Sequence, residues 1–262
     1  MLARIMVSAA VWSGCLGSNC AFGNQAEEAY FQPGVRNSRT RSLSANQLRD
    51  LAEGIRIWTG FAEVHFDQQG RLRIGDSKRT TGGSEAARAL IAAAVESSDA
   101  FLLENHSRSM AVAFASIQPV EDYVDAGEVR HAVWNLKLDF HDFAQLRGGS
   151  EALAAFDPAI CLLHELGHGV LHLRDSVSPS DSLGDCEHYL NRIRREAGRA
   201  ERQSYLPWYR LGSTLDQPVQ SVLAQLLFVK RGADNKAKTT LLSFRMESVC
   251  APMVFRQQTG TN

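Results

Sequence analysis

The first ordered stretch of the chain shows two kinds of hydrophobic spacing. Apolar residues at helical spacing predict two amphipathic helices, which start after Ser44 and Ser84 because serine can cap a helix. Between them, apolar positions alternate on both sides of a Gln69-Gly70 turn and predict a β-hairpin. The apolar residues of these elements are Leu48, Leu51, Ile55, Val64, Phe66, Leu72, Ile74, Ala87, Leu90, Ile91, Ala94 and Val95.

The middle of the chain predicts strands, and the second half predicts helices. Residues 101–104, 110–117 and 129–140 have strand spacing, and we expect the last strand to be exposed on one side. The spacing becomes helical over three further segments. These segments are residues 149–173, 183–197 and 215–230. Together the elements amount to an α+β fold.

The composition narrows the class of protein. The 262 residues are 44% hydrophobic, which suffices for a buried core in a single domain over residues 44–262. A net charge of −1 gives no electrostatic basis for nonspecific binding to nucleic acid. No apolar run approaches the roughly 20 residues that a membrane span needs. The five scattered cysteines form no disulfide framework, and we expect Cys161 and Cys186 to be unpaired buried thiols.

The N-terminal 43 residues lack the periodicity of the later chain. Residues 24–44 combine Gly, Pro, Asn, Ser and Arg without helix or strand spacing, which predicts a disordered leader over residues 1–43. A weak secretory signal peptide is the alternative, because a basic residue precedes a short apolar stretch over residues 5–12. That stretch is short for a signal peptide, so we favour the leader.

One helical segment carries the clearest chemistry of the chain. His164-Glu165-Leu166-Gly167-His168 has the H-E-x-x-H pattern. Histidines four residues apart lie one turn apart on a helix, so both imidazoles can reach one zinc ion. Glu165 can then take a proton from the water that zinc activates. The sequence therefore predicts a metallohydrolase with one zinc ion per chain.

A catalytic zinc ion needs a third protein ligand and an open position. The downstream candidates are Asp175, Asp181, Asp185, Glu187 and His188. Glu187 is the best of these, because it lies near the start of the next predicted helix, and two antiparallel helices would bring it to the metal. Asp185 and His188 remain alternatives, since a shift of the helix start would turn them inward.

Other polar residues are candidates for supporting roles. Asn191 lies one turn after Glu187, where it could orient a ligand histidine. Tyr205, Arg202 and Arg194 could hold the oxyanion that forms during peptide hydrolysis, and each could equally anchor a helix.

The residues around the H-E-x-x-H motif resemble a family of bacterial effectors. The run from Gly184 to Gly198 contains the pattern Asn-x-x-Arg-x-Glu-x-Gly, and Arg202 and Tyr205 follow it. Over residues 128–205 the chain is similar to the HopH-like and NleD-like zinc metalloproteases of type III secretion. One departure is that Leu190 stands where some NleD-like members have glutamate.

The resemblance implies a zincin-like fold, in which a small mixed sheet packs on the motif helix and a second helix bears a ligand. It also implies a zinc-dependent endopeptidase that is injected into a host cell as a virulence factor and cleaves a host protein. A secretion chaperone would bind the leader, whereas a signal peptide would instead direct export to the periplasm. We expect the substrate to bind as an extended peptide, which could pair with the strand over residues 133–138.

A binding module is the competing interpretation. A catalytically silent zinc domain or adaptor effector could hold a partner with the same fold. A structural zinc site is closed by four protein ligands and needs no carboxylate beside the metal. Glu165 therefore favours the enzyme.

Overall fold

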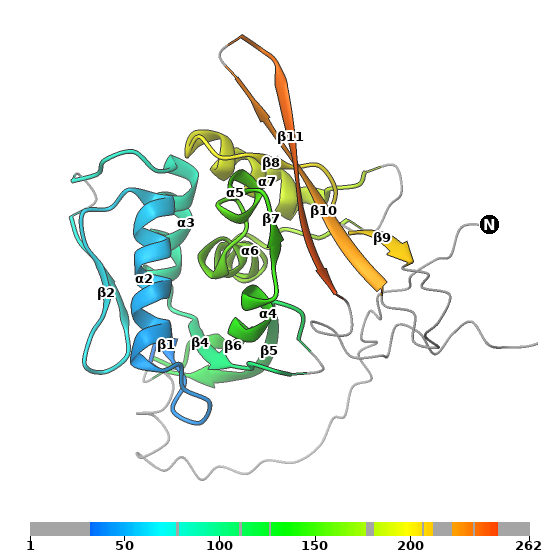
Figure 1. Cartoon of the computed structure of the whole chain (residues 1–262). Coiled ribbons are helices and arrows are strands. Elements are labelled where there is room, and N and C mark those ends of the chain that lie inside the picture. Colours follow the sequence, from blue (N-terminus) through cyan, green and yellow to red (C-terminus); the bar gives the residue numbers. More distant parts are fainter. Residues whose placement is uncertain are drawn as a thin grey trace, which may run out of the picture.

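Figure 1 shows the computed structural model, whose described residues form an α+β fold. The described residues are 32–76, 79–109, 112–125, 127–176, 181–205, 207–211, 222–232 and 234–245. Helix α6 (Pro158–Leu171) lies at the centre, in contact with the other long helices and with one sheet. The expected fold class is thus confirmed at the level of α+β.

The first sheet has the strand order β1-β4-β6-β5. Strands β1 (Gly34–Asn37), β4 (Ala100–Asn105) and β6 (Arg130–Leu138) are parallel, and β5 (Ala115–Val124) pairs antiparallel with β6 at the edge. Because β6 lies between β4 and β5, both of its hydrogen-bonding edges are occupied. The expectation that residues 133–138 pair with a substrate is therefore wrong. The outer edge of β5 has no paired strand among the described residues.

Strand β1 corrects the end of the predicted leader. Residues 34–37 pair with β4, and the Val35 side chain is fully buried. A four-residue strand with one apolar side chain shows no periodicity, so the sequence pattern could not reveal it. Residues 1–31, which carry the rest of the leader and the alternative signal peptide, lie outside the described residues.

The first two helices and the hairpin agree with the hydrophobic pattern. Helix α2 (Ala45–Thr59) starts at a capping box in which Ser44 and Gln47 bond reciprocally, and Ser84 caps α3 (Glu85–Glu96). The hairpin pairs β2 with β3 around the expected turn. These two strands span Val64–Phe66 and Leu72–Ile74.

The segment predicted as one helix over residues 149–173 is interrupted. A short helix, α5 (Ser150–Leu153), comes first, and α6 begins only at Pro158, because the Asp157 carboxylate caps it by accepting from the Ile160 N–H at 2.8 Å. Helix α4 (Phe140–Ala144) and strand β7 (Arg147–Gly148) precede the predicted segment. Further along the chain, α7 (Gly184–Glu196) agrees with the prediction.

The second sheet overturns the helix predicted over residues 215–230 where the structure describes it, from residue 222 onward, and residues 215–221 lie outside the described residues. Strand β10 (Val222–Arg231) pairs with β11 (Ala237–Arg245), β8 (Glu201–Arg202) and β9 (Trp208–Leu211). Its buried residues alternate, as strand spacing requires. They are Ala224, Leu226 and Phe228. A continuous apolar run fits a buried helix as well as a strand, and here the pairing with β11 decides.

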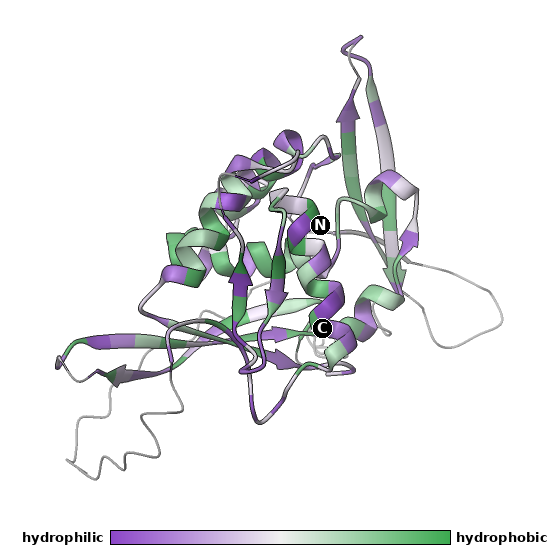
Figure 2. Ribbon diagram, turned by 90° about the vertical axis from the view of Figure 1, so that its left-hand side faces the viewer, coloured by the Kyte–Doolittle hydropathy of each residue, from purple (hydrophilic) through white to green (hydrophobic). Residues whose placement is uncertain are grey.

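Hydrophobic residues gather on the central helices, whereas the tip of the β10–β11 hairpin is hydrophilic (Figure 2). None of the helices in the described segments has the length and hydropathy needed to span a bilayer.

Candidate metal centre

Helix α6 presents the two motif histidines on one face, as predicted. The ring centroids of His164 and His168 lie 4.8 Å apart and the ring planes are nearly perpendicular, at 79°. The other faces of α6 are buried against apolar residues of the core. This packing fixes the orientation of the helix and therefore the positions of the two histidines. The helix thus holds two imidazoles side by side in a largely apolar environment.

Asp175 completes a group of three donor atoms. Helix α6 ends at Leu171, and the next residue, His172, adopts a left-handed conformation with φ 55° that turns the chain back toward the helix. Asp175 Oδ1 then lies 3.1 Å from His164 Nε2 and 3.5 Å from His168 Nε2. This oxygen is buried, yet neither contact has hydrogen-bond geometry. Three converging atoms without a hydrogen bond between them are the arrangement that a metal ion would complete.

The charges of this group favour a cation between the three side chains. The His168 Nδ1 atom bonds to the Leu173 carbonyl at 2.7 Å, which leaves Nε2 to face Asp175. Burial lowers the pKa of His168, but Asp175 and the Leu173 carbonyl outweigh it and raise the pKa to about 9. Burial likewise raises the pKa of Asp175, and the contacts with His164 and His168 hold that pKa well below its usual range. A proton or a metal ion would fit this position.

Cys186 is a fourth possible donor, to which the sequence analysis assigned no role. Its Sγ, the two histidines and Asp175 offer donor atoms within 4.8 Å of one another. In the structure the thiol is buried and donates to the His164 carbonyl at 3.4 Å. Burial raises the pKa of the thiol, and a metal binds cysteine only as the thiolate. Cys161 is also a free buried thiol, so the expectation for both cysteines is confirmed.

Glu165 lies beside the donor group but is not part of it. The residue is 8% exposed, and its carboxylate accepts a hydrogen bond from the Ile117 N–H of β5. Burial raises the pKa of this carboxyl, although His164 and His168 oppose the shift. A buried carboxylate between a metal site and a sheet edge is suited to accept a proton.

The structure does not place Glu187 among the donors. Its Oε2 atom lies 3.8 Å from His164 Nδ1, on the opposite side of the ring from Asp175. Arg194 binds one carboxylate oxygen, and Arg202 Nη1 binds the other at 3.2 Å. Burial raises the pKa of Glu187, but Arg194 and Arg202 outweigh it and lower the pKa to about 2. In this geometry the group of side chains that could hold a metal ion includes Asp175 and does not include Glu187.

The other supporting candidates bind each other behind the metal centre. Asn191 donates to the Arg202 carbonyl at 2.7 Å and accepts from the Arg202 N–H and from Arg194, so it does not orient a histidine. Arg194 and Arg202 are 2% and 8% exposed and face Glu187. Their ion pairs with Glu187 support the alternative that these arginines anchor a helix. Neither guanidinium points to the Nε2 atoms of the two histidines, where an oxyanion would form.

Tyr205 does lie at the centre. Its ring stacks on the His164 ring, with centroids 5.7 Å apart and planes at 8°, and its hydroxyl bonds to the Asp175 carboxylate. Burial and the negative charge of Asp175 raise the pKa of this hydroxyl, which therefore stays a neutral donor. The structure thus brings Tyr205 to the ligand set.

The remaining ligand candidates lie outside the centre. The His188 Nε2 and Asp181 Oδ1 atoms lie 3.3 Å apart, in side chains about half exposed. Asp185 is exposed on α7.

No family model, curated protein or solved structure matches this chain.

Proposed function

We propose that the chain is a zinc-dependent peptidase with a zincin-like arrangement of motif helix and sheet. The observation that supports this proposal is the convergence of His164 Nε2, His168 Nε2 and Asp175 Oδ1 beside the buried carboxyl of Glu165. Two imidazoles and one carboxylate are a ligand set of catalytic zinc, and a fourth position is then left for water or substrate.

The proposed mechanism assigns a separate role to each side chain. Zinc, when bound, would activate a water molecule and polarise the carbonyl of the scissile peptide bond. Glu165 accepts the proton of that water and passes it to the leaving amine, a role that suits a carboxyl whose pKa burial has raised. Tyr205 holds Asp175 through its hydroxyl and is the one sequence-based oxyanion candidate in contact with the ligand set.

Strand β5 offers a place for an extended substrate next to this machinery. It forms the free edge of the first sheet, and its Ile117 N–H points at Glu165. In an antiparallel strand a residue's N–H and C=O point to the same side, so the Ile117 carbonyl faces outward and can accept from a peptide. The resemblance to type III effectors supports a host protein as the substrate.

A closed zinc site in a binding or adaptor protein is the second candidate, and Cys186 is the observation that favours it. If the Cys186 thiolate bound the metal, four protein donors would surround it and no position would remain for water. The two functions therefore differ in what Cys186 does.

The test of catalysis compares Glu165→Gln with the wild-type chain. Zinc content should stay near one equivalent, while cleavage of a proteome-derived peptide library should fall at least ~10²-fold, because the amide cannot take the proton. Glu53→Gln, in an exposed side chain on α2, should leave both unchanged. Zinc bound by a wild-type chain that cleaves no peptide at all would favour the binding protein.

The test of the ligand set uses two matched pairs. Asp175→Asn should weaken zinc binding at least ~10-fold, and Asp181→Asn in the same connection should not. Cys186→Ser should keep zinc and activity if the site is open, whereas loss of zinc would indicate a closed four-donor site.

A further inference from the structure

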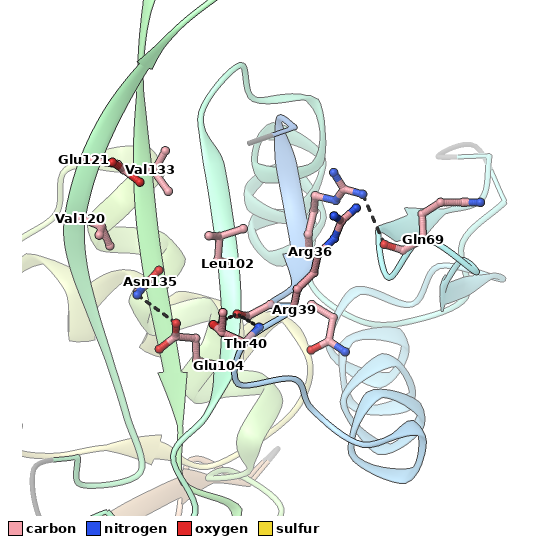
Figure 3. A pocket seen from close by; sticks show the side chains of 12 residues that line it. Arg36, Arg39, Thr40, Gln69, Leu102, Glu104, Val120, Glu121, Val133 and Asn135 are labelled. Atoms are coloured by element: carbon pink, nitrogen blue, oxygen red, sulfur yellow. Dashed lines mark hydrogen bonds between the residues drawn. The ribbon is translucent and has the colours of Figure 1, made fainter. Parts of the chain in front are cut away.

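Two buried carboxyls at α4, those of Asp139 and Asp142, have no cation beside them. Other buried acids of the fold do have such partners: Glu104, which lines the cavity of Figure 3, accepts from Asn135 at 3.1 Å and bonds to His106 at 2.9 Å. Asp139 and Asp142 are 0% and 1% exposed, and neither forms an ion pair with a described lysine, arginine or histidine. A buried carboxyl without a counter-charge favours its protonated form.

Asp139 is the better placed of the two to keep a negative charge. Its Oδ1 atom accepts from the backbone N–H groups of His141 and Asp142 at 2.9 and 3.2 Å, and its Oδ2 atom accepts from that of Ser109 at 3.0 Å. Asp142 accepts from one described N–H group, that of Phe114, at 2.9 Å. Because N–H donors stabilise the ionised form, Asp142 is the carboxyl of this pair that takes up a proton first.

The pKa of Asp142 agrees with this assignment. Burial is the main cause that raises it, the Phe114 N–H opposes the shift, and the charge of Asp139 adds to it, so that the pKa reaches about 7. Charged or titratable side chains also lie on the segments around α4 and its aromatic neighbours, and none has a marked effect on this pKa. These side chains are His106, Arg108, His141, Arg147, Asp157 and Arg245.

The N–H group that Asp142 binds belongs to a residue in an unfavourable backbone conformation. Phe114 has φ 63°, in the left-handed region that residues with a Cβ rarely adopt. Two bonds hold it there, because its carbonyl also accepts from the Asp139 N–H at 2.9 Å. Its ring packs at centroid distances between 5.0 and 5.2 Å against the rings of Phe143, Phe156 and Phe244. The α4 carboxyls therefore fix the residue directly before β5.

We propose that Asp142 is a proton-sensitive anchor for the start of β5: the anchor stays closed when this carboxyl is protonated and opens more readily when it is ionised. Opening exposes Asp142 to water, and an ionised carboxylate gains more from hydration than a neutral carboxyl does. The released proton goes to the solvent. Strand β5 begins at Ala115, and two residues later the Ile117 N–H bonds to Glu165. An open anchor would thus loosen the strand next to the metal centre.

The pH range of this effect follows from the two states of Asp142. In the open state its pKa is the ordinary 3.8, and in the closed state it is about 7. Between these values each opening releases one proton, so the opening constant rises up to about tenfold per pH unit and levels off above pH 7. The anchor is therefore firmest at acidic pH, and this contribution is lost as the pH rises through about 7.

Hydrogen–deuterium exchange of the full-length protein, with a chelator present, measures this opening. After correction for intrinsic exchange rates, the amides of residues 112–118 should lose protection by up to about tenfold per pH unit until about pH 7. Asp142→Asn can still accept from Phe114 but has no proton to release, so its protection should not depend on pH and should exceed that of wild type at least about tenfold near pH 7. Asp122→Asn, in a β5 side chain that is 47% exposed, should keep the wild-type profile.

Protection of residues 112–118 that does not vary with pH in the wild-type protein would overturn the proposal, and so would a wild-type pH dependence in Asp142→Asn. If the melting temperature shows that Asp142→Asn does not fold, Asp139→Asn provides a second test. Loss of the neighbouring charge lowers the pKa of Asp142 and should move the plateau to lower pH, whereas an unmoved plateau would also overturn the proposal.

Only the effect of the anchor on catalysis rests on the proposed function. The exchange experiment needs neither zinc nor substrate. A chain that cleaves no peptide but shows the expected exchange profile would therefore refute the peptidase and leave the anchor in place.

Discussion

Glu187 lies fully buried between His164 and two arginines. A carboxylate behind a ligand histidine holds the ring in place and makes it a better ligand. Glu187 Oε2 lies 3.8 Å from His164 Nδ1, beyond hydrogen-bond distance, and Arg194 and Arg202 bind its carboxylate. In this geometry Glu187 is the counter-charge of two buried arginines.

Glu187→Gln should strongly destabilise the fold even without metal. The substitution leaves the Arg194 guanidinium, which is 2% exposed, without its counter-charge, and breaking a buried pair in this way costs about 3–5 kcal/mol. Urea denaturation in the presence of a chelator measures this loss. Glu201→Gln is the control, because its Arg195 partner is 65% exposed and such a pair contributes at most about 1 kcal/mol. Equal losses in the two variants would contradict the structural role of Glu187.

At the scale of single residues, spacing alone predicted His164, Glu165 and His168, because the four-residue interval and the helix fix where these side chains lie. Asp175 could not be chosen in the same way. It lies beyond the helix end, and its position depends on the left-handed turn at His172, which no periodicity encodes.

At the scale of elements, Glu196 joins the end of α7 to the start of α3. Its Oε2 atom accepts from the Ser84 hydroxyl at 2.7 Å and from the Ala86 N–H at 2.9 Å, and Oε1 accepts from Arg192. An acidic side chain at a helix N-terminus is favourable because it meets unpaired N–H groups and the positive end of the helix dipole. One side chain thus caps a helix of another part of the chain.

Glu196→Gln should make stability less dependent on pH. Burial raises the pKa of Glu196, but the bonds from Ala86, Ser84 and Arg192 outweigh it and lower the pKa to about 2. The carboxylate therefore stabilises the fold above the ordinary glutamate pKa of about 4.5, and this contribution disappears as the pH falls toward 2.

Denaturation with a chelator present should show wild type more stable than Glu196→Gln by about 1–3 kcal/mol near pH 7, and a much smaller difference near pH 2. Glu85→Gln, exposed in the first turn of α3, should show a small difference throughout. A constant difference across the pH range would rule out the proposed linkage.

Capped amphipathic elements were the ones that the sequence could predict. Helices α2 and α3 have serine caps and one apolar face each, so local signals were sufficient. The segment that forms β10 has apolar residues on all sides, and its conformation depends on pairing with β11. Local spacing cannot report that pairing, which is why a helix was predicted there.

At the scale of the whole molecule, the parallel pairing of β1 with β4 is the least predictable feature. Gly34 pairs with Ala100, so the contact joins residues that two helices and a hairpin separate along the chain. Such a register follows from packing of the complete sheet and not from either strand alone. The α+β class could be predicted, but the strand order could not.

The free edge of β5 also bears on whether the protein associates with itself. Ile117 and Pro119 lie on the same side of the strand by alternation; the Ile117 N–H is bonded to Glu165, and Pro119 has no N–H. A β-bulge follows at Glu121. If two copies paired through this edge, backbone carbonyls would face backbone carbonyls without N–H donors between them, which disfavours a dimer through β5. A peptide whose backbone N–H groups face the edge can still pair with it. Pro119→Val restores one donor and should increase self-association, measurable by sedimentation velocity, whereas an unchanged monomer would show that the edge is protected in another way.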